Sequence, residues 1–146
     1  MRMFVKKPGL YLSGAIEFAD DAFGWRWKME RALQHLYNVI IPYSADPPHK
    51  KNERKYQYWV QETFIFPDLA HVSLCPEFFV KLDKGVFKGA GTTSELTMAC
   101  WMRKNIVAFL DGITVDELPG WMLGCLADSL FVDSIDDAIE HYRKLG

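Results

Sequence analysis

The sequence predicts an α/β protein built on a parallel β-sheet that carries helices on both faces. Short apolar runs, typical of buried strands, alternate with segments whose apolar residues recur at helical spacing. The 146 residues are 49% hydrophobic, which is enough for one well-filled core. Because no internal repeat, low-complexity tract or linker interrupts the pattern, residues 1–146 are expected to form a single domain.

The first two strands are expected near the start of the chain. An apolar run at Gly9–Gly14 ends on a glycine, and a second run covers residues 38–41. Between them, Asp20 and Asp21 are candidate N-caps for a helix. The apolar residues of that helix at 3.6-residue spacing are Trp25, Met29, Ala32, Leu33 and Leu36. Residues 43–57 are polar and aperiodic, which predicts a long loop.

The middle of the chain has a weaker pattern. A short helix is expected over residues 58–66, closed by Pro67 and Asp68. The apolar residues of Leu69–Leu74 predict the third strand, although two polar residues interrupt this run. Residues 77–87 are then expected to form a second loop.

The last third of the chain returns to clear alternation. Residues 105–110 predict the fourth strand, residues 118–123 a short helix, and residues 129–132 the fifth strand. Ser134 is a candidate N-cap for a final helix that runs through Tyr142. The completed pattern therefore has five strands.

Glu95 is the first candidate for chemistry. Residues 88–95 combine glycines and hydroxyl residues and lead into a helical pattern, so Glu95 is expected in the first turn of a helix. The helix dipole favours an ionised carboxylate there by ~0.3–1 kcal/mol, and an ionised carboxylate is what covalent nucleophilic catalysis requires. Thr92 and Glu95 also fit a capping box, in which Glu95 accepts a hydrogen bond from the Thr92 backbone N–H. Both interpretations stay open at this point.

The topology predicts where a site would form. In parallel α/β sheets, ligands bind beyond the carboxyl ends of the strands, where the strand order reverses. Residues 11–16, Asp46, Asp68 and the segment 89–95 all lie at predicted element ends of this kind. Asp68 and Glu95 are therefore expected to face one crevice.

Composition excludes several classes of protein. A formal net charge of −2 gives no reason to expect a nucleic-acid surface, and no apolar run approaches the ~20 residues of a membrane span. The first residues lack the pattern of a signal peptide. Cys75, Cys100 and Cys125 are odd in number and lie among apolar neighbours, which predicts reduced thiols in a cytoplasmic protein. No metal or cofactor is expected.

Four segments together resemble the nucleoside 2-deoxyribosyltransferase family and its relatives, the 2′-deoxynucleoside 5′-phosphate N-hydrolases. They are Tyr11-Leu-Ser-Gly-Ala-Ile16, Gly24-Trp-Arg26, Pro67-Asp68-Leu69 and Gly91-Thr-Thr-Ser-Glu95-Leu96. The resemblance covers roughly residues 9–140. It implies a flavodoxin-like, doubly wound parallel sheet of five strands, and a homodimer or higher homo-oligomer.

The resemblance also implies roles for individual residues. Glu95 is the expected nucleophile at the anomeric carbon, Tyr11 holds it in place, and Asp68 helps to protonate the leaving base. The residues expected to contact the substrate are Ser13, Gly14, Ala15, Ile16, Arg26, Gly91 and Thr92. From the residues alone, Asp68 also fits an ordinary turn or cap, and Tyr11 also fits core packing with a hydrogen-bonded hydroxyl.

The chemistry agrees with these residue types. Glycosidic cleavage passes through an oxocarbenium-like transition state, which a carboxylate at the anomeric carbon stabilises or traps covalently. A second acid supplies the proton on which departure of the base depends, worth about 10²–10⁴ in rate. Transfer to a new base requires that water be excluded. Aromatic residues that serve either as walls of such a pocket or as core are Phe18, Trp25, Tyr43 and Tyr58.

The chain departs from the family pattern at two positions. Gly89 stands where family members often carry an acidic residue or a serine, and Glu17 stands where the hydrolases tend to have arginine. An acid at position 17 repels a 5′-phosphate unless Lys88 or Arg26 compensates for its charge.

Three functions follow as hypotheses. The first is transfer of a deoxyribosyl group between nucleobases, with a 2′-deoxynucleoside and a free base as small-molecule partners and neither nucleic acid nor membrane involved. The second is hydrolysis of nucleoside 5′-monophosphates to base and sugar phosphate, and the third is a nucleotide-binding module without turnover. In the transferases a neighbouring subunit donates a residue to the site, and the corresponding positions are Asp128 and Ser129.

Overall fold

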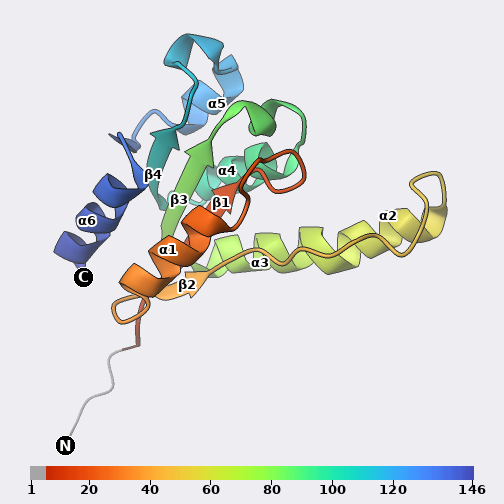
Figure 1. Cartoon of the computed structure of the whole chain (residues 1–146), viewed down its shortest axis with the longest axis horizontal. Coiled ribbons are helices and arrows are strands. Elements are labelled where there is room, and N and C mark those ends of the chain that lie inside the picture. The colour runs from red at the N-terminus through yellow and green to blue at the C-terminus, as the bar shows by residue number, and fades with distance from the viewer. Residues whose placement is uncertain (1–5) are drawn as a thin grey trace, which may run out of the picture.

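The structure is a computed structural model that describes residues 6–146. It contains a five-stranded, all-parallel sheet in the order β2-β1-β3-β4-β5 (Figure 1). The strands are β1 (Gly9–Gly14), β2 (Asn38–Ile40), β3 (Glu77–Leu82), β4 (Asn105–Leu110) and β5 (Leu130–Val132). The helices are α1 (Gly24–Leu33), α2 (Arg54–Val60), α3 (Phe66–Leu74), α4 (Gly91–Trp101), α5 (Gly120–Cys125) and α6 (Ile135–Leu145). The predicted α/β, flavodoxin-like class is confirmed.

The strand order places a switch point beside β1. The chain passes from β1 outward to β2, then crosses back to β3 on the other side of β1. Connections that diverge in this way leave a crevice at the carboxyl ends of the strands, which is where such sheets bind ligands. The carboxyl end of β1 is therefore the expected position of a site.

Two apolar layers enclose the sheet. Helices α1 and α6 cover one face, and α3, α4 and α5 cover the other. Along β1 the side chains alternate, as the strand period of two requires: Leu10 and Leu12 pack under α1, while Tyr11 packs on the opposite face, where its ring stacks on Phe78. Tyr11 thereby points toward the layer that contains α4.

The helix predicted over residues 58–66 is found, but the predicted secondary structure of residues 69–82 is wrong. Leu69–Leu74 lies in α3 and forms no strand, while the third strand is β3, inside the expected loop. A six-residue apolar run does not distinguish a buried strand from one side of a helix, and only Val72 of α3 is fully buried. In β3, the apolar sequence Phe78-Phe79-Val80 is buried, but the charged residues at positions 77 and 81 shorten the apolar run to three residues, too few to predict a strand.

The prediction that Pro67 ends a helix is wrong, because the helical chain continues through this residue. A π-helical turn at Gln61–Ile65 joins α2 to α3, and Pro67 occupies the first turn of α3, where its missing N–H is tolerated. The three segments form one long helical arm that extends away from the sheet (Figure 1). The segment that follows β2 runs along this arm, where Tyr43 stacks on Phe64 with ring centroids 6.2 Å apart.

One of the predicted helix starts is confirmed and two differ. Ser134 Oγ accepts a hydrogen bond from Asp137 N and caps α6 as predicted. At α1 the predicted caps Asp20 and Asp21 are wrong, because the N-cap is Phe23 and has no side-chain cap, although Asp21 Oδ1 accepts a hydrogen bond from Gly24 N. At α4 the boundary differs. The helix begins at Gly91, so Glu95 lies in its second turn and outside the predicted first turn.

Within residues 6–146, no helix is both long and apolar enough to cross a membrane. The organisation of residues 1–146 as a single domain stays a prediction.

Candidate active site

The carboxylate of Glu95 is buried and held by two hydroxyl groups of β1. Tyr11 Oη donates a hydrogen bond to Glu95 Oε2, and Ser13 Oγ donates one to Oε1 at 2.7 Å. Glu95 is only 8% exposed. No side chain caps the start of α4 through a hydrogen bond, so Glu95 does not complete the capping box with Thr92. Its carboxylate instead links α4 to β1 through the hydrogen bonds from Tyr11 and Ser13.

Strand geometry explains why the two hydroxyl groups meet one carboxylate. Tyr11 and Ser13 are two residues apart, so both side chains leave the same face of β1. That face is covered by α4, where Leu96 and Ala99 pack on the sheet beside Glu95. The polar cluster is therefore fixed by the same packing that builds the core.

Opposing effects set the protonation of Glu95. Burial raises the pKa of its carboxyl group, while the hydrogen bonds from Tyr11 and Ser13 and the positive charge of Arg26 lower it. Burial and the charge of Glu95 also raise the pKa of the Tyr11 phenol, so Tyr11 stays a donor. Two donated O–H groups require acceptor oxygens, which favours the ionised carboxylate. Burial is the largest of these effects and leaves the pKa of Glu95 raised, and these partners, not a position in the first turn of a helix, oppose it.

Asp68 is the second acid near this cluster. It lies in the first turn of α3 and is half-buried. Burial, and next the charge of Glu95, raise the pKa of Asp68 to about 7, against the opposing charge of Arg26. No hydrogen bond or ion pair of its carboxyl group is found within residues 6–146. An acid that titrates near neutral pH is suited to proton transfer.

Arg26 is placed differently from its expected role as a substrate contact. The side chain is fully buried, and its guanidinium donates to the backbone carbonyls of Leu12, Gly14 and Ala22. It also lies over the Trp25 ring, 4.5 Å from the centroid. These contacts occupy the group on its own chain, and a 5′-phosphate does not reach it in this conformation.

The remaining predicted contacts lie around the same strand end. Ser13 and Gly14 end β1, and Ala15 and Ile16 begin the loop to α1. Gly91 and Thr92 form the first turn of α4, where Thr92 is buried and Gly91 is exposed. The other two positions of interest, Asp128 and Ser129, precede β5, and the Ser129 hydroxyl is buried without a hydrogen-bond partner among the described residues.

The four aromatic residues considered as pocket walls are divided between core and surface. Trp25 is 8% exposed and packs in the core, with its ring centroid 5.6 Å from that of Phe79. Tyr43 lies in the segment after β2 and packs against the helical arm, and Tyr58 is exposed on α2. Phe18 alone among them combines exposure with a position over the strand ends, beside Gly89.

A cavity of about 560 Å³ opens at the carboxyl ends of β3 and β4. Phe18, Trp25 and Gly85 line it, together with Lys81, whose Nζ lies 2.8 Å from Asp83 and 3.1 Å from Asp111. Neither Glu95 nor Asp68 lines this cavity. Sequence reasoning missed Lys81 because β3 was assigned to a loop. The charged residue directly after the buried run Phe-Phe-Val is the available signal.

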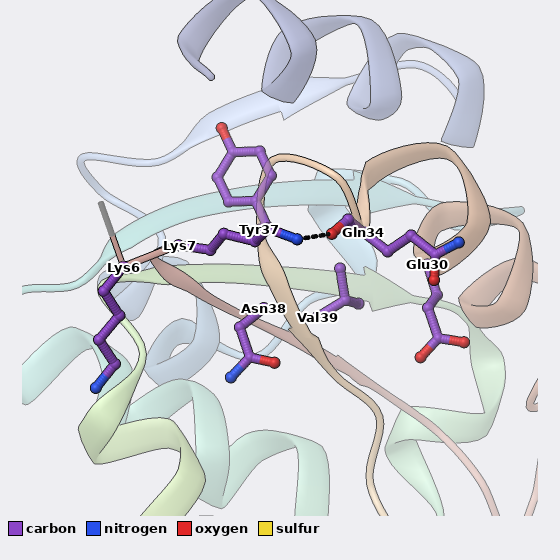
Figure 2. A pocket seen from close by; sticks show the side chains of 7 residues that line it. All are labelled: Lys6, Lys7, Glu30, Gln34, Tyr37, Asn38 and Val39. Carbon is purple, nitrogen blue, oxygen red and sulfur yellow. Dashed lines mark hydrogen bonds between the residues drawn. The ribbon is translucent and has the colours of Figure 1, made fainter. Parts of the chain in front are cut away.

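A second cavity, of about 410 Å³, lies at the opposite end of the strands, near the amino ends of β1 and β2 (Figure 2). It is lined by residues at the amino ends of β1 and β2 and on α1, and in Figure 2 Lys7 Nζ donates to Gln34 O at 2.9 Å. None of the predicted site residues lines it. In the described part of the chain, no group of three or more His, Cys, Asp or Glu side chains is arranged to hold a metal ion.

Comparison with solved structures finds similar folds, among them those of a conserved protein, a 2-deoxyribosyltransferase and a CMP N-glycosidase. A conserved protein from Enterococcus faecalis V583 has a TM-score of 0.69 at 15% identity, covering 97% of this chain and 100% of that one. A 2-deoxyribosyltransferase from Bacillus psychrosaccharolyticus has a TM-score of 0.61 at 19% identity, covering 90% of each chain. A CMP N-glycosidase from Clostridium botulinum has a TM-score of 0.57 at 12% identity, covering 93% of this chain and 99% of that one.

No family model matches the chain, and no curated protein matches it either. At identities of 12–19%, the structural matches establish the fold.

Proposed function

We propose that this protein cleaves the N-glycosidic bond of 2′-deoxynucleosides and transfers the deoxyribosyl group to another nucleobase. The observation that carries the proposal is the buried Glu95 carboxylate, which is held by hydrogen bonds from Tyr11 and Ser13 and whose charge helps to raise the pKa of Asp68 to about 7. Two of the structurally similar proteins are named a 2-deoxyribosyltransferase and a CMP N-glycosidase, which supports an N-glycosidic bond as the target here. Membership of the nucleoside 2-deoxyribosyltransferase family is part of the proposal.

The proposed reaction has two displacement steps. A Glu95 oxygen attacks C1′ of the sugar while the C1′–N bond breaks, and the bonding electron pair leaves with the base. Asp68 donates its proton to a nitrogen of the departing base, which therefore leaves as a neutral molecule. In the second step a nitrogen of the incoming base attacks C1′ and displaces the Glu95 carboxylate, and Asp68 takes up the proton that the incoming base loses.

The positions of the hydroxyl groups fit this sequence of steps. Tyr11 and Ser13 fix both oxygens of the Glu95 carboxylate before any substrate arrives, so little reorganisation is needed at attack. Ser13 is thus proposed to orient the nucleophile, beside its expected contact with the substrate. Gly14, Ala15 and Ile16 are proposed to lie along the sugar, with Gly91 and Thr92 at the floor of the pocket.

Hydrolysis of nucleoside 5′-monophosphates is the second candidate, and one observation favours it. Lys84 and Lys88 line the 560 Å³ cavity, and neither forms an ion pair within residues 6–146. Glu17 lies 3.7 Å from Lys51, which offsets part of its repulsion toward a phosphate. In this reaction water replaces the incoming base in the second step.

One experiment separates the candidates. The protein is incubated with each 2′-deoxynucleoside, or its 5′-monophosphate, together with a different free base, and the products are resolved by chromatography. A new nucleoside supports transfer, whereas sugar phosphate formed only from the monophosphates supports hydrolysis. Binding without turnover, unchanged in Glu95→Ala, supports a non-catalytic nucleotide-binding module.

We also propose that the protein forms a homodimer through the helices beside the site. Trp101 at the end of α4 is 85% exposed, and Trp121 in α5 is 67% exposed. Trp121 Nε1 donates to Thr97 Oγ1 at 2.9 Å, and Thr97 precedes Trp101 by one helical turn, so the two rings form one tryptophan patch. Exposed aromatic patches of this kind mark interfaces. The three free cysteines fit a reducing compartment, and we place the protein in the cytoplasm.

A further inference from the structure

The Arg26 side chain, on helix α1, forms three hydrogen bonds to backbone carbonyl groups. Its Nε donates to Leu12 O at 3.2 Å and its Nη2 to Gly14 O at 2.8 Å, while Nη1 donates to Ala22 O. The side chain has no exposed surface, although α1 is otherwise a half-exposed helix. An arginine is almost never fully buried unless its charge is paired or its donors are satisfied.

The register of the sheet shows what Arg26 replaces. β2 ends at Ile40, which pairs with Tyr11, so the last three residues of β1 pair with β3 only. Arg26 donates to two carbonyl groups in this one-sided stretch and to a third at the far end of the following loop. Its planar fork reaches all three, which a lysine ammonium on a single stem does not. The guanidinium therefore ties the end of β1 to the approach to α1.

The positive charge of Arg26 interacts electrostatically with the acidic groups of the site. The groups around it are Tyr11, Asp68, Glu95 and Asp83, contributed by β1, α3, α4 and the segment after β3. Burial lowers the pKa of the Arg26 guanidinium to about 10, and these four groups oppose that shift, so Arg26 stays protonated at neutral pH. In return its charge lowers the pKa of both Glu95 and Asp68.

We propose that Arg26 is a positioning residue that fixes the loop between β1 and α1 over the site and supplies the fixed positive charge for the Glu95 carboxylate, without touching the substrate. This inference rests on the proposed function for its catalytic consequence. Its structural part, the tie between strand, loop and helix, stands on the three hydrogen bonds and the complete burial of the side chain.

The test compares Arg26→Lys and Arg26→Met with the wild type. Lysine keeps the charge but loses the fork, and methionine loses both. The control is Lys28→Met on the same helix, where Lys28 is exposed and pairs with Asp136 at 2.7 Å. The readouts are the pH profile of kcat, KM, and amide hydrogen exchange over residues 15–22.

The two variants are expected to differ. In Arg26→Met the acidic and basic limbs of the pH profile of kcat both move to higher pH, by about one pH unit. The reason is that the Arg26 cation of the wild type lowers the pKa of both Glu95 and Asp68, and this effect is lost. In Arg26→Lys the limbs stay close to the wild type. Exchange of the loop amides becomes faster in both variants, kcat falls more than KM changes, and Lys28→Met leaves every readout unchanged.

Unshifted limbs in a folded Arg26→Met, or wild-type loop exchange in Arg26→Lys, overturn the inference. If Arg26→Met does not fold, loop exchange in Arg26→Lys alone decides. If the wild type cleaves no nucleoside, the proposed function fails separately, and the carboxyl carbon of Glu95 is titrated by ¹³C NMR, with Glu95→Gln giving the assignment. A Glu95 pKa equal in wild type and Arg26→Met then rejects the charge role as well.

Discussion

Tyr11 and Glu95 are 84 residues apart in the chain, and their side chains are joined by a buried hydrogen bond. The bond links the central strand of the sheet to the helix that packs on it, so it forms only when both are in their native places. A buried carboxylate held by neutral donors is costly for stability, because water solvates it better than two hydroxyl groups do. A group of this kind indicates a functional site more than a stabilising contact.

Tyr11→Phe removes one of the two donors and keeps the ring that stacks on Phe78. The pKa of Glu95 is expected to rise, because the Tyr11 hydrogen bond lowers it, and the acidic limb of activity moves to higher pH. Removing one pre-positioned donor is expected to lower kcat by about 10–10². The matched control is Tyr37→Phe, which removes a buried hydrogen bond to Tyr142 O far from the site. It is expected to cost about 1 kcal/mol of stability and no activity.

Glu95→Gln preserves shape and removes the nucleophile. Loss of several kcal/mol of transition-state stabilisation is expected to lower kcat by at least ~10³. Stability at pH 8 is expected to be equal or higher, since a buried charge is removed, and urea denaturation measures it. Glu140→Gln, at an exposed pair with Lys144, is the control that changes neither quantity. Retention of more than about a tenth of the wild-type kcat rules out Glu95 as the nucleophile.

Asp68→Asn tests the raised pKa of the second acid. The folded state holds this proton up to about pH 7, whereas the unfolded chain releases it near 3.8. Between these values the folded state binds more protons, so the free energy of unfolding falls as pH rises. Urea denaturation from pH 4 to pH 8 is expected to show this fall in the wild type, by about 1–2 kcal/mol after solvent screening, and a smaller one in Asp68→Asn. An identical slope in both proteins contradicts the raised pKa.

The predictable parts of this fold are those where local pattern and tertiary context agree. The run Gly9–Gly14 is apolar, ends on glycine and lies at the centre of the sheet, so it is found correctly. The prediction of the third strand fails because Lys81, near the carboxyl end of β3, interrupts the apolar run. Its charge is compensated by Asp83 and Asp111, which come from other segments and are invisible in a local pattern.

The features of the site also divide into those that the sequence predicts and those that only the folded structure reveals. The rule that sites form at strand ends predicts Asp68 and Glu95 at one crevice, and the charge of Glu95 does raise the pKa of Asp68, although the element assigned to Asp68 is wrong. The burial of Arg26 is not predictable from its neighbours, because arginine is ordinarily exposed and its three acceptors are backbone carbonyls set by the fold. The capping box with Thr92 is a good local pattern that the donors of β1 override.

Trp101→Glu tests the proposed homodimer. A charge placed in the tryptophan patch is expected to disfavour burial of the patch against a second copy, so the variant sediments as a monomer where the wild type sediments as a dimer. Leu145→Glu is the control, since Leu145 is 60% exposed at the end of α6 on the opposite face of the sheet. A wild type that is monomeric at every concentration tested contradicts the proposal.

Gly85→Ala tests the contact between the two loops that border the site. A Cβ at position 85 lies 2.6 Å from Phe18 O and 3.0 Å from Ala15 Cβ, so the backbone of the loop after β1 has to move. Overpacking of this kind is expected to cost about 1–3 kcal/mol of stability, measured by urea denaturation. It is also expected to lower kcat, since the displaced loop carries the proposed sugar contacts Ala15 and Ile16.

The matched control is Gly124→Ala in α5, where an added Cβ meets no atom within 4 Å. This variant is expected to gain about 0.5–1 kcal/mol, because alanine loses less backbone entropy in a helix than glycine does, and to keep full activity. If both glycine variants behave alike, the close approach at Gly85 does not constrain the loop. Loss of activity in Gly85→Ala alone, at a temperature where both variants remain folded, ties the position of the loop to catalysis.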